Sequence, residues 1–73
     1  MDMRRRVGLN LKRERSIKGW SQEELADQSG LHRTYISLLE RGLRVPSIDV
    51  LRKLAVGLET TMTSLIREFE QAK

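Results

Sequence analysis

The chain has 73 residues and a formal net charge of +4, which fits one small domain and excludes a multi-domain enzyme with its own substrate cleft. It contains no cysteine and one histidine, so a disulfide framework is excluded and no structural zinc site is expected. No apolar run approaches the roughly 20 residues of a membrane span, and the basic N-terminus is not followed by the apolar stretch of a signal peptide. We therefore expect a cytoplasmic protein without membrane contact, and a core this small favours self-association.

A first helix is predicted from about residue 3 to residue 17. Its apolar residues recur every four positions, as they do on one face of a helix, at Met3, Val7 and Leu11. Gly19 ends this helix, and its other faces are strongly basic. The three consecutive residues Arg4, Arg5 and Arg6 fit either an arm that follows DNA or a solvated run of terminal charges.

The charge is uneven along the chain. Residues 1–20 carry a net charge of +5, residues 21–40 a net charge of −3, and residues 41–73 a net charge of +2. Basic ends on either side of an acidic middle suit a polyanionic partner. Charge alone does not distinguish nucleic acid from a membrane surface or from a contribution to solubility.

Two short helices joined by a tight turn are predicted over about residues 22–41. Ser21 and Glu24 form a capping box before the first of them, because each satisfies a free backbone N–H of the other. Gly30 ends that helix in the left-handed conformation, and Gly42 stops the second helix. The residues expected to face inward are Leu25, Ala26, Leu31, Ile36 and Leu39. Small Ala26 lets the helices approach, and the larger residues fix their crossing angle, which is the arrangement of a helix-turn-helix.

A fourth helix is predicted to begin at Pro46-Ser47, and a fifth, capped by Thr61, over about residues 62–71. Their apolar residues are Leu51, Leu54, Ala55 and Leu58 in the fourth, and Met62, Leu65, Ile66 and Phe69 in the fifth. No segment alternates with period two, so the expected fold is all-α, and residues 1–73 form one domain. Ile66 and Phe69 either complete the core of the monomer or form a dimer interface. We favour the dimer interface, because so small a core gains most from pairing.

These residues resemble the lambda-repressor-like (Xre/Cro-type) helix-turn-helix family over nearly the whole chain. The resemblance rests on Arg15 and on four segments, Gly19 to Ala26, Gly30-Leu31, Ile36 to Gly42, and Pro46-Ser47 with the apolar stripe that follows. It implies a compact five-helix DNA-binding domain, a homodimer on a pseudo-palindromic operator, and regulation of transcription. The segment from His32 to Ser37 resembles the recognition helix of restriction–modification controller proteins. The chain departs from the family pattern at Trp20 and Glu14, where smaller aliphatic and apolar residues are usual, which indicates some repacking near the first helix.

The third helix supplies the candidate residues for reading DNA bases. With Ile36 and Leu39 directed to the core, its other faces turn outward. The candidate base-reading residues are Arg33, Thr34, Tyr35, Ser37 and Leu38. An arginine in the first turn can bond guanine N7 and O6 together, and Thr34 and Leu38 can each place a methyl group against thymine. Tyr35 and Ser37 can donate to base edges or phosphates.

The candidate phosphate-binding residues flank this helix and are Gln22, His32, Arg41 and Arg44. The backbone N–H of Gln22 lies at the positive end of the second helix. Arg41 and Arg44 follow the third helix, where they can bind phosphates of the DNA strand that flanks the groove. His32 is interpreted as a helix cap or phosphate neighbour rather than a metal ligand, because no second ligand accompanies it. The family resemblance further implies that Arg15 and Glu40 form an ion pair that bridges the first and third helices and orients the reading helix.

Two functions from different classes fit these features. The leading one is a homodimer on double-stranded DNA whose third helices, ~34 Å apart, read two half-sites and block or recruit RNA polymerase. The alternative is a protein-interaction module, an antitoxin or adaptor, in which Tyr35 and Leu38 face a protein; the arginines argue against it. An enzyme is not expected, because no nucleophile with an adjacent base appears, and no cofactor or metal is predicted. Helix capping and the helix dipole explain the carboxylates of Glu23, Glu24 and Asp27.

Overall fold

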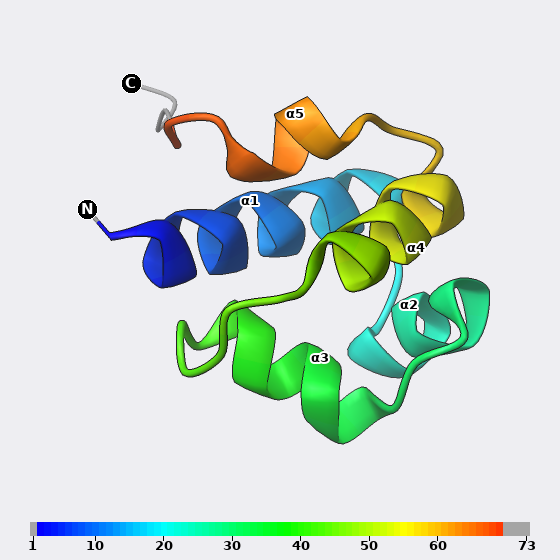
Figure 1. Cartoon of the computed structure of the whole chain (residues 1–73). Coiled ribbons are helices and arrows are strands. Elements are labelled where there is room, and N and C mark those ends of the chain that lie inside the picture. The colour runs from blue at the N-terminus through cyan, green and yellow to red at the C-terminus, as the bar shows by residue number, and fades with distance from the viewer. Residues whose placement is uncertain (1, 70–73) are drawn as a thin grey trace.

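The computed structural model describes residues 2–69, and over that range the chain folds into five α-helices and no β-strand (Figure 1). The helices are α1 (Met3–Lys18), α2 (Gln22–Ser29), α3 (Arg33–Glu40), α4 (Ile48–Leu58) and α5 (Met62–Ile66). This confirms the all-α, five-helix fold predicted from the sequence. Among these described helices, none has the length and apolar character needed to cross a membrane.

Side chains next to the helices set where most of them begin. The side chains of Asp2, Ser21, Ser47 and Thr61 each accept a hydrogen bond from a backbone N–H in the first turn of α1, α2, α4 and α5. The capping box before α2 is complete, because the Ser21 N–H donates to Glu24 Oε1 over 2.9 Å and the Glu24 N–H donates to Ser21 Oγ over 3.0 Å. These local contacts explain why the helix starts could be predicted closely.

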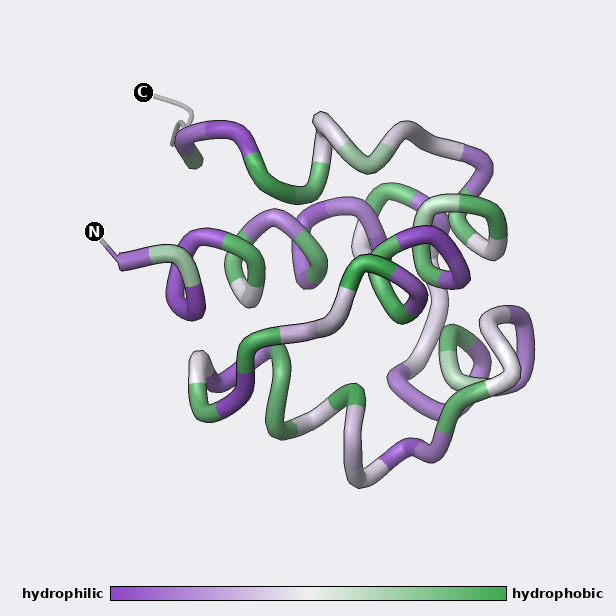
Figure 2. The backbone as a smooth tube through the Cα atoms, in the orientation of Figure 1, coloured by the Kyte–Doolittle hydropathy of each residue, from purple (hydrophilic) through white to green (hydrophobic). Residues whose placement is uncertain are grey.

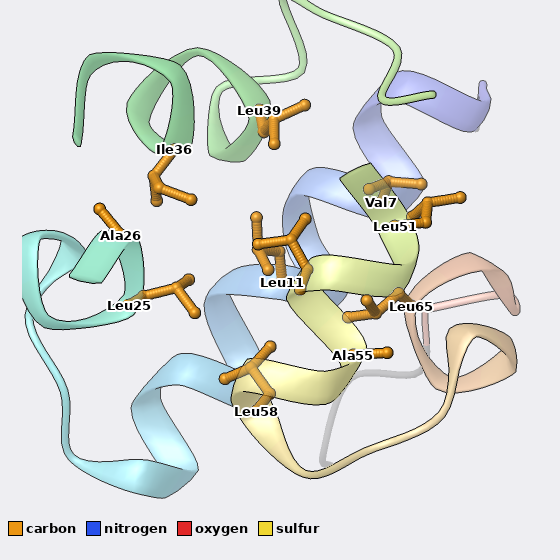
Figure 3. Packing of buried hydrophobic residues seen from close by; sticks show 11 residues of the cluster. Val7, Leu11, Leu25, Ala26, Ile36, Leu39, Leu51, Ala55, Leu58 and Leu65 are labelled. Atoms are coloured by element: carbon orange, nitrogen blue, oxygen red, sulfur yellow. The ribbon is translucent and has the colours of Figure 1, made fainter. Parts of the chain in front are cut away.

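The core is one apolar cluster to which all five helices contribute. Its buried members are Val7, Leu11, Leu25, Ala26, Ile36, Leu39, Leu51, Leu54, Ala55, Leu58 and Leu65. Figure 3 shows these side chains converging on Leu11 of α1. Along α1 and α4 in Figure 2, hydrophobic and hydrophilic residues alternate as expected for helices with one buried face. Met3, which was predicted on the apolar face of the first helix, is instead exposed, because it lies one full turn before the first core residue, Val7.

Two glycines let helices pack with their backbones close together. A Cβ placed on Gly8 in α1 would lie 2.5 Å from the carbonyl oxygen of Leu39 in α3, and a Cβ on Gly57 in α4 would lie 2.7 Å from Ser29 Oγ in α2. Both distances are shorter than a side chain permits. The end of α3 is therefore seated directly against the first half of α1.

The fifth helix is shorter than predicted. It ends at Ile66, and Arg67 is extended, whereas the sequence indicated a helix to about residue 71; residues 70 and 71 lie outside the described range. The buried side chain of Asn10 in α1 donates from Nδ2 to the carbonyl oxygens of Leu65 (3.1 Å) and Arg67 (2.7 Å). Because α1 satisfies these carbonyls, continued helical hydrogen bonding is not needed to pair them.

Candidate nucleic-acid interface

The reading element is formed by α2, the turn at Gly30 and α3, which lie together at one edge of the molecule, away from α5 (Figure 1). Gly30 has φ of 68°, a left-handed conformation that glycine adopts without a Cβ penalty. The Leu31 N–H then donates to the Ala26 carbonyl oxygen over 2.9 Å, which closes the turn. Ile36 and Leu39 are fully buried, so α3 is fixed to the core by one side and presents the other.

The five candidate base-reading residues all lie on α3 but differ in exposure. Arg33 and Thr34, in the first turn, are exposed, and Ser37 and Leu38 are half-buried. Tyr35 is also half-buried and packs against the core cluster. The first turn of α3 therefore offers a guanidinium and a hydroxyl with a methyl group to a partner, while Tyr35 is partly committed to the fold.

The candidate phosphate-binding residues lie at the start of α2 and around the two ends of α3. His32 is the N-cap residue of α3, and its side chain makes no capping hydrogen bond. Arg41 is the C-cap residue of α3, Arg44 follows in the connection to α4, and both are exposed. Gln22 is the first residue of α2. Exposed cations and the amino end of a helix thus flank the exposed side of α3, as a phosphate backbone would require.

The ion pair that the family resemblance implies is present between α1 and α3. Arg15 Nε donates to Glu40 Oε2 over 2.7 Å and Arg15 Nη2 donates to Glu40 Oε1 over 3.0 Å. Only 15% of the Arg15 side chain and 4% of the Glu40 side chain are exposed. The hydrogen bonds to Glu40 raise the pKa of Arg15 above its ordinary value, against an opposing effect of burial, so this guanidinium stays charged.

The side chain of Gln22 also joins this pair, whereas the sequence pointed only to the backbone N–H of this residue. Its Nε2 donates to Glu40 Oε1 over 3.0 Å. Arg15 Nη1 also donates to the carbonyl oxygen of Trp20, over 2.8 Å. One buried carboxylate therefore ties together α1, the start of α2 and the end of α3.

Gly8 positions the reading element and Asn10 positions the end of α5, and neither was singled out from the sequence. Gly8 seats the end of α3 against α1, and Asn10 holds the end of α5. Each had a signal in the sequence. Gly8 interrupts a helical pattern, and Asn10 is a polar residue on the same helix face as Val7 and Leu11.

Of the two candidate dimer residues, Ile66 is the last residue of α5 and Phe69 lies beyond it. Ile66 is half-buried against the core cluster. Phe69 is also half-buried, with the Arg13 guanidinium 5.2 Å from its ring centroid. Both residues retain exposed surface in the monomer. Within residues 2–69, histidine and carboxylate side chains do not gather in groups of three or more that could hold a metal.

Known proteins resemble this chain in sequence and in the fold described above. Residues 11–65 match a protein family described as helix-turn-helix. The uncharacterized HTH-type transcriptional regulator y4dJ of Sinorhizobium fredii is 44% identical over 66 residues, which cover 90% of this chain and 86% of that protein. The control protein C.SmaI of Serratia marcescens is 41% identical over 66 residues, which cover 90% of this chain and 79% of that protein. The restriction–modification controller protein C.Esp1396I, solved as a tetramer in complex with its natural 35 base-pair operator, superposes with a TM-score of 0.78 at 39% identity, covering 84% of this chain and 80% of that one.

Proposed function

We infer that this chain, which belongs to the helix-turn-helix family of DNA-binding transcriptional regulators, acts as a homodimer on a pseudo-palindromic operator. The observation that carries this inference is that α3 is anchored by one side and exposed on the other. Its buried residues Ile36 and Leu39 and the clamped Glu40 fix it to the core, while Arg33 and Thr34 are exposed. A short helix held in this way fits the major groove of DNA.

Sequence is read from the exposed side of α3. Arg33 bonds guanine N7 and O6 together, a contact that discriminates by ~1–3 kcal/mol. Thr34 and Leu38 contact thymine methyl groups, and Ser37 donates to a base edge or phosphate. Tyr35 contributes through its hydroxyl while its ring packs on the core.

The phosphate contacts fix the register of α3 in the groove. The amino end of α2 at Gln22, whose side chain bonds Glu40 at the carboxyl end of α3, receives one phosphate. Arg41 and Arg44 hold the strand beyond that same end. His32, at the amino end of α3, contacts the DNA backbone there. Since Arg15 and Glu40 join α1 to the end of α3, they set the angle at which these groups meet the DNA.

Two copies pair through the region of Ile66 and Phe69, which places their α3 helices ~34 Å apart, one turn of the duplex. The exposed surface that both residues retain supports this assignment. The dimer acts in the cytoplasm by occupancy, either blocking or recruiting RNA polymerase, and no catalytic step is assigned to it. The similarity to C.SmaI and C.Esp1396I favours the genes of a restriction–modification system as its targets.

A binding selection on randomised duplex DNA, followed by titration of the enriched sequence at two salt concentrations, tests this function. We expect an inverted repeat with half-site centres one turn apart, bound with an affinity that falls steeply with salt. If no sequence is enriched and binding stays weak, the chain is instead a protein-interaction module such as an antitoxin or adaptor.

Sedimentation of the wild type and of Phe69→Ser tests the dimer. We expect the substitution to shift the population toward the monomer while the helical circular dichroism spectrum is kept. An unchanged monomer–dimer equilibrium would move the interface away from Phe69.

A further inference from the structure

The turn after α3 packs against the start of α1, although the two segments lie far apart in the sequence. A Cβ placed on Gly42 would be 3.3 Å from the Cα of Arg5 and 3.8 Å from the carbonyl carbon of Arg4. In Figure 1 the first turn of α1 lies beside the connection between α3 and α4. The fold therefore brings Arg4 and Arg5 next to Arg41 and Arg44, which flank this turn.

Four exposed arginines stand on the two segments that meet here. Arg4, Arg5, Arg41 and Arg44 are all exposed. Among residues 2–69, the ion pairs join Arg13 to Glu14, Arg15 to Glu40 and Lys18 to Glu59, so none of them neutralises this group. The neighbouring Arg6 differs, because its Nη1 donates to the carbonyl oxygen of Ile66 over 3.4 Å.

Helix stability does not account for arginines in this position. The amino end of a helix carries partial positive charge, so cations in the first turn are unfavourable. The first turn of α1 nevertheless contains no acidic residue. Asp2 compensates as the cap, where its Oδ1 accepts the Arg5 N–H over 2.9 Å. This hydrogen bond, with a smaller contribution from the charge of Arg4, lowers the pKa of the Asp2 carboxyl. A partner that is itself anionic would explain why the positive charge is concentrated here.

We propose that Arg4, Arg5, Arg41 and Arg44 form a flank cluster that binds consecutive phosphates of the DNA strand beside the half-site read by α3. This proposal rests on the proposed function and adds DNA contacts outside the half-site. The partner is DNA because Arg41 is the C-cap residue of α3, so the cluster continues directly from the reading element. A DNA strand presents one phosphate every ~3.4 Å of helix axis, which suits a row of guanidinium groups. The contact is independent of base sequence.

The test compares the double variant Arg4→Gln/Arg5→Gln with the matched variant Arg52→Gln/Lys53→Gln, which removes two exposed charges from α4. Both are titrated over a salt series against the selected operator with extended flanks and against a random-sequence duplex. Each phosphate contact contributes a slope of about −0.9 in log affinity against log salt. We therefore expect the first variant to lose about tenfold or more in affinity at ~0.1 M salt and to flatten the slope by about 2. The matched variant should keep the wild-type slope.

Two further readouts separate this binding role from a structural one. The melting temperature of Arg4→Gln/Arg5→Gln should equal or exceed that of the wild type, because cations leave the amino end of α1. On an operator trimmed to its half-sites, the wild type and this variant should bind with nearly equal affinity. A slope equal to that of the matched variant on both long duplexes overturns the flank cluster. That result is distinct from failure of the proposed function, in which the wild type enriches no operator.

Discussion

Arg15 and Glu40 join α1 to the last residue of α3 through two parallel N–H···O bonds, and Glu40 accepts a third bond from Gln22. These three donors come from two other helices. A buried pair of charges adds less to stability than its Coulomb energy indicates, because both ions lose their water. Its consequence here is orientation, since Arg15 can satisfy both bonds only with the end of α3 in this position.

Replacing Glu40 by glutamine should cost about 2 kcal/mol of stability, because the Arg15 charge loses its buried counterion. Operator affinity should fall further than stability alone explains, since α3 and Gln22 lose their common anchor. Urea unfolding and operator titration measure the two effects. Glu14→Gln is the matched control, because Glu14 lies 3.9 Å from its partner Arg13 and should change little. Equal stability of the two variants would contradict this role of Glu40.

Gly8→Ala should destabilise the protein, although alanine favours helix more than glycine by about 1 kcal/mol. The new Cβ would lie 2.5 Å from the Leu39 carbonyl oxygen and 2.8 Å from that of Glu40. Both atoms belong to the backbone, so α1 and α3 must separate, at a net cost of about 1–3 kcal/mol. Thermal unfolding checks this, with exposed Ser16→Ala in the same helix as the control. A melting temperature at or above the wild type for Gly8→Ala would show that α3 is free to shift.

Local chemistry explains what could be predicted from the sequence. Ser21 with Glu24, and Gly30 after them, lie within a few residues of the backbone groups they serve, so the start and end of α2 follow from the sequence alone. The periodic placement of Ile36 and Leu39 likewise fixes which side of α3 is buried. The same reasoning gives the exposed position of Arg33.

The features that were missed depend on contacts between distant segments. The end of α5 is set by Asn10 in α1, and no residue near position 66 signals it. The placement of Arg5 beside Gly42 depends on how α1 and α3 cross. The hydrogen bond from Gln22 to Glu40 requires the same crossing. Sequence periodicity identifies which side of each helix is buried, but not which groups meet across a crossing.

Glu59→Gly should raise the melting temperature by roughly 3–6 °C, because Glu59 ends α4 with φ of 56°, where a Cβ is strained. The substitution also removes an exposed ion pair with Lys18 at 2.7 Å. Lys18 lowers the pKa of Glu59 below its ordinary value. The Lys18–Glu59 pair therefore stabilises the fold fully at a pH above the ordinary pKa of a glutamate. This stabilisation is lost as the pH falls through the lowered pKa of Glu59.

The gain from Glu59→Gly should accordingly be larger at high salt, and larger at a pH below the lowered pKa, than at neutral pH and low salt. Calorimetry under these conditions measures it. Glu59→Gln, which keeps the strained Cβ and loses the charge, is the control and should not raise the melting temperature. A gain from Glu59→Gly that does not change with salt or pH would show that the Lys18 pair contributes nothing.

Arg33→Ala should abolish discrimination at one guanine of each half-site while the fold is kept, because the Arg33 side chain is exposed. The expected loss on the operator is ~1–3 kcal/mol, and variants at that base pair should then bind equally well. Competition titrations against all four base pairs at each position measure this. Arg44→Ala should instead weaken binding to every sequence alike, as a phosphate contact does. A uniform loss for Arg33→Ala as well would place Arg33 on the phosphate backbone.

Leu38→Ala should remove a preference for thymine that can be isolated chemically, because deoxyuridine lacks only the C5-methyl group. We expect the wild type to bind less tightly when one thymine of the half-site is replaced by deoxyuridine. Leu38→Ala should bind both duplexes equally, since the methyl group then has no apolar partner. Thr34→Ser, which keeps a hydroxyl and loses a methyl group, makes the same test one turn earlier on α3. The variant that loses the preference for thymine identifies the residue that contacts the methyl group. If both variants keep the preference, neither Leu38 nor Thr34 contacts a thymine methyl group.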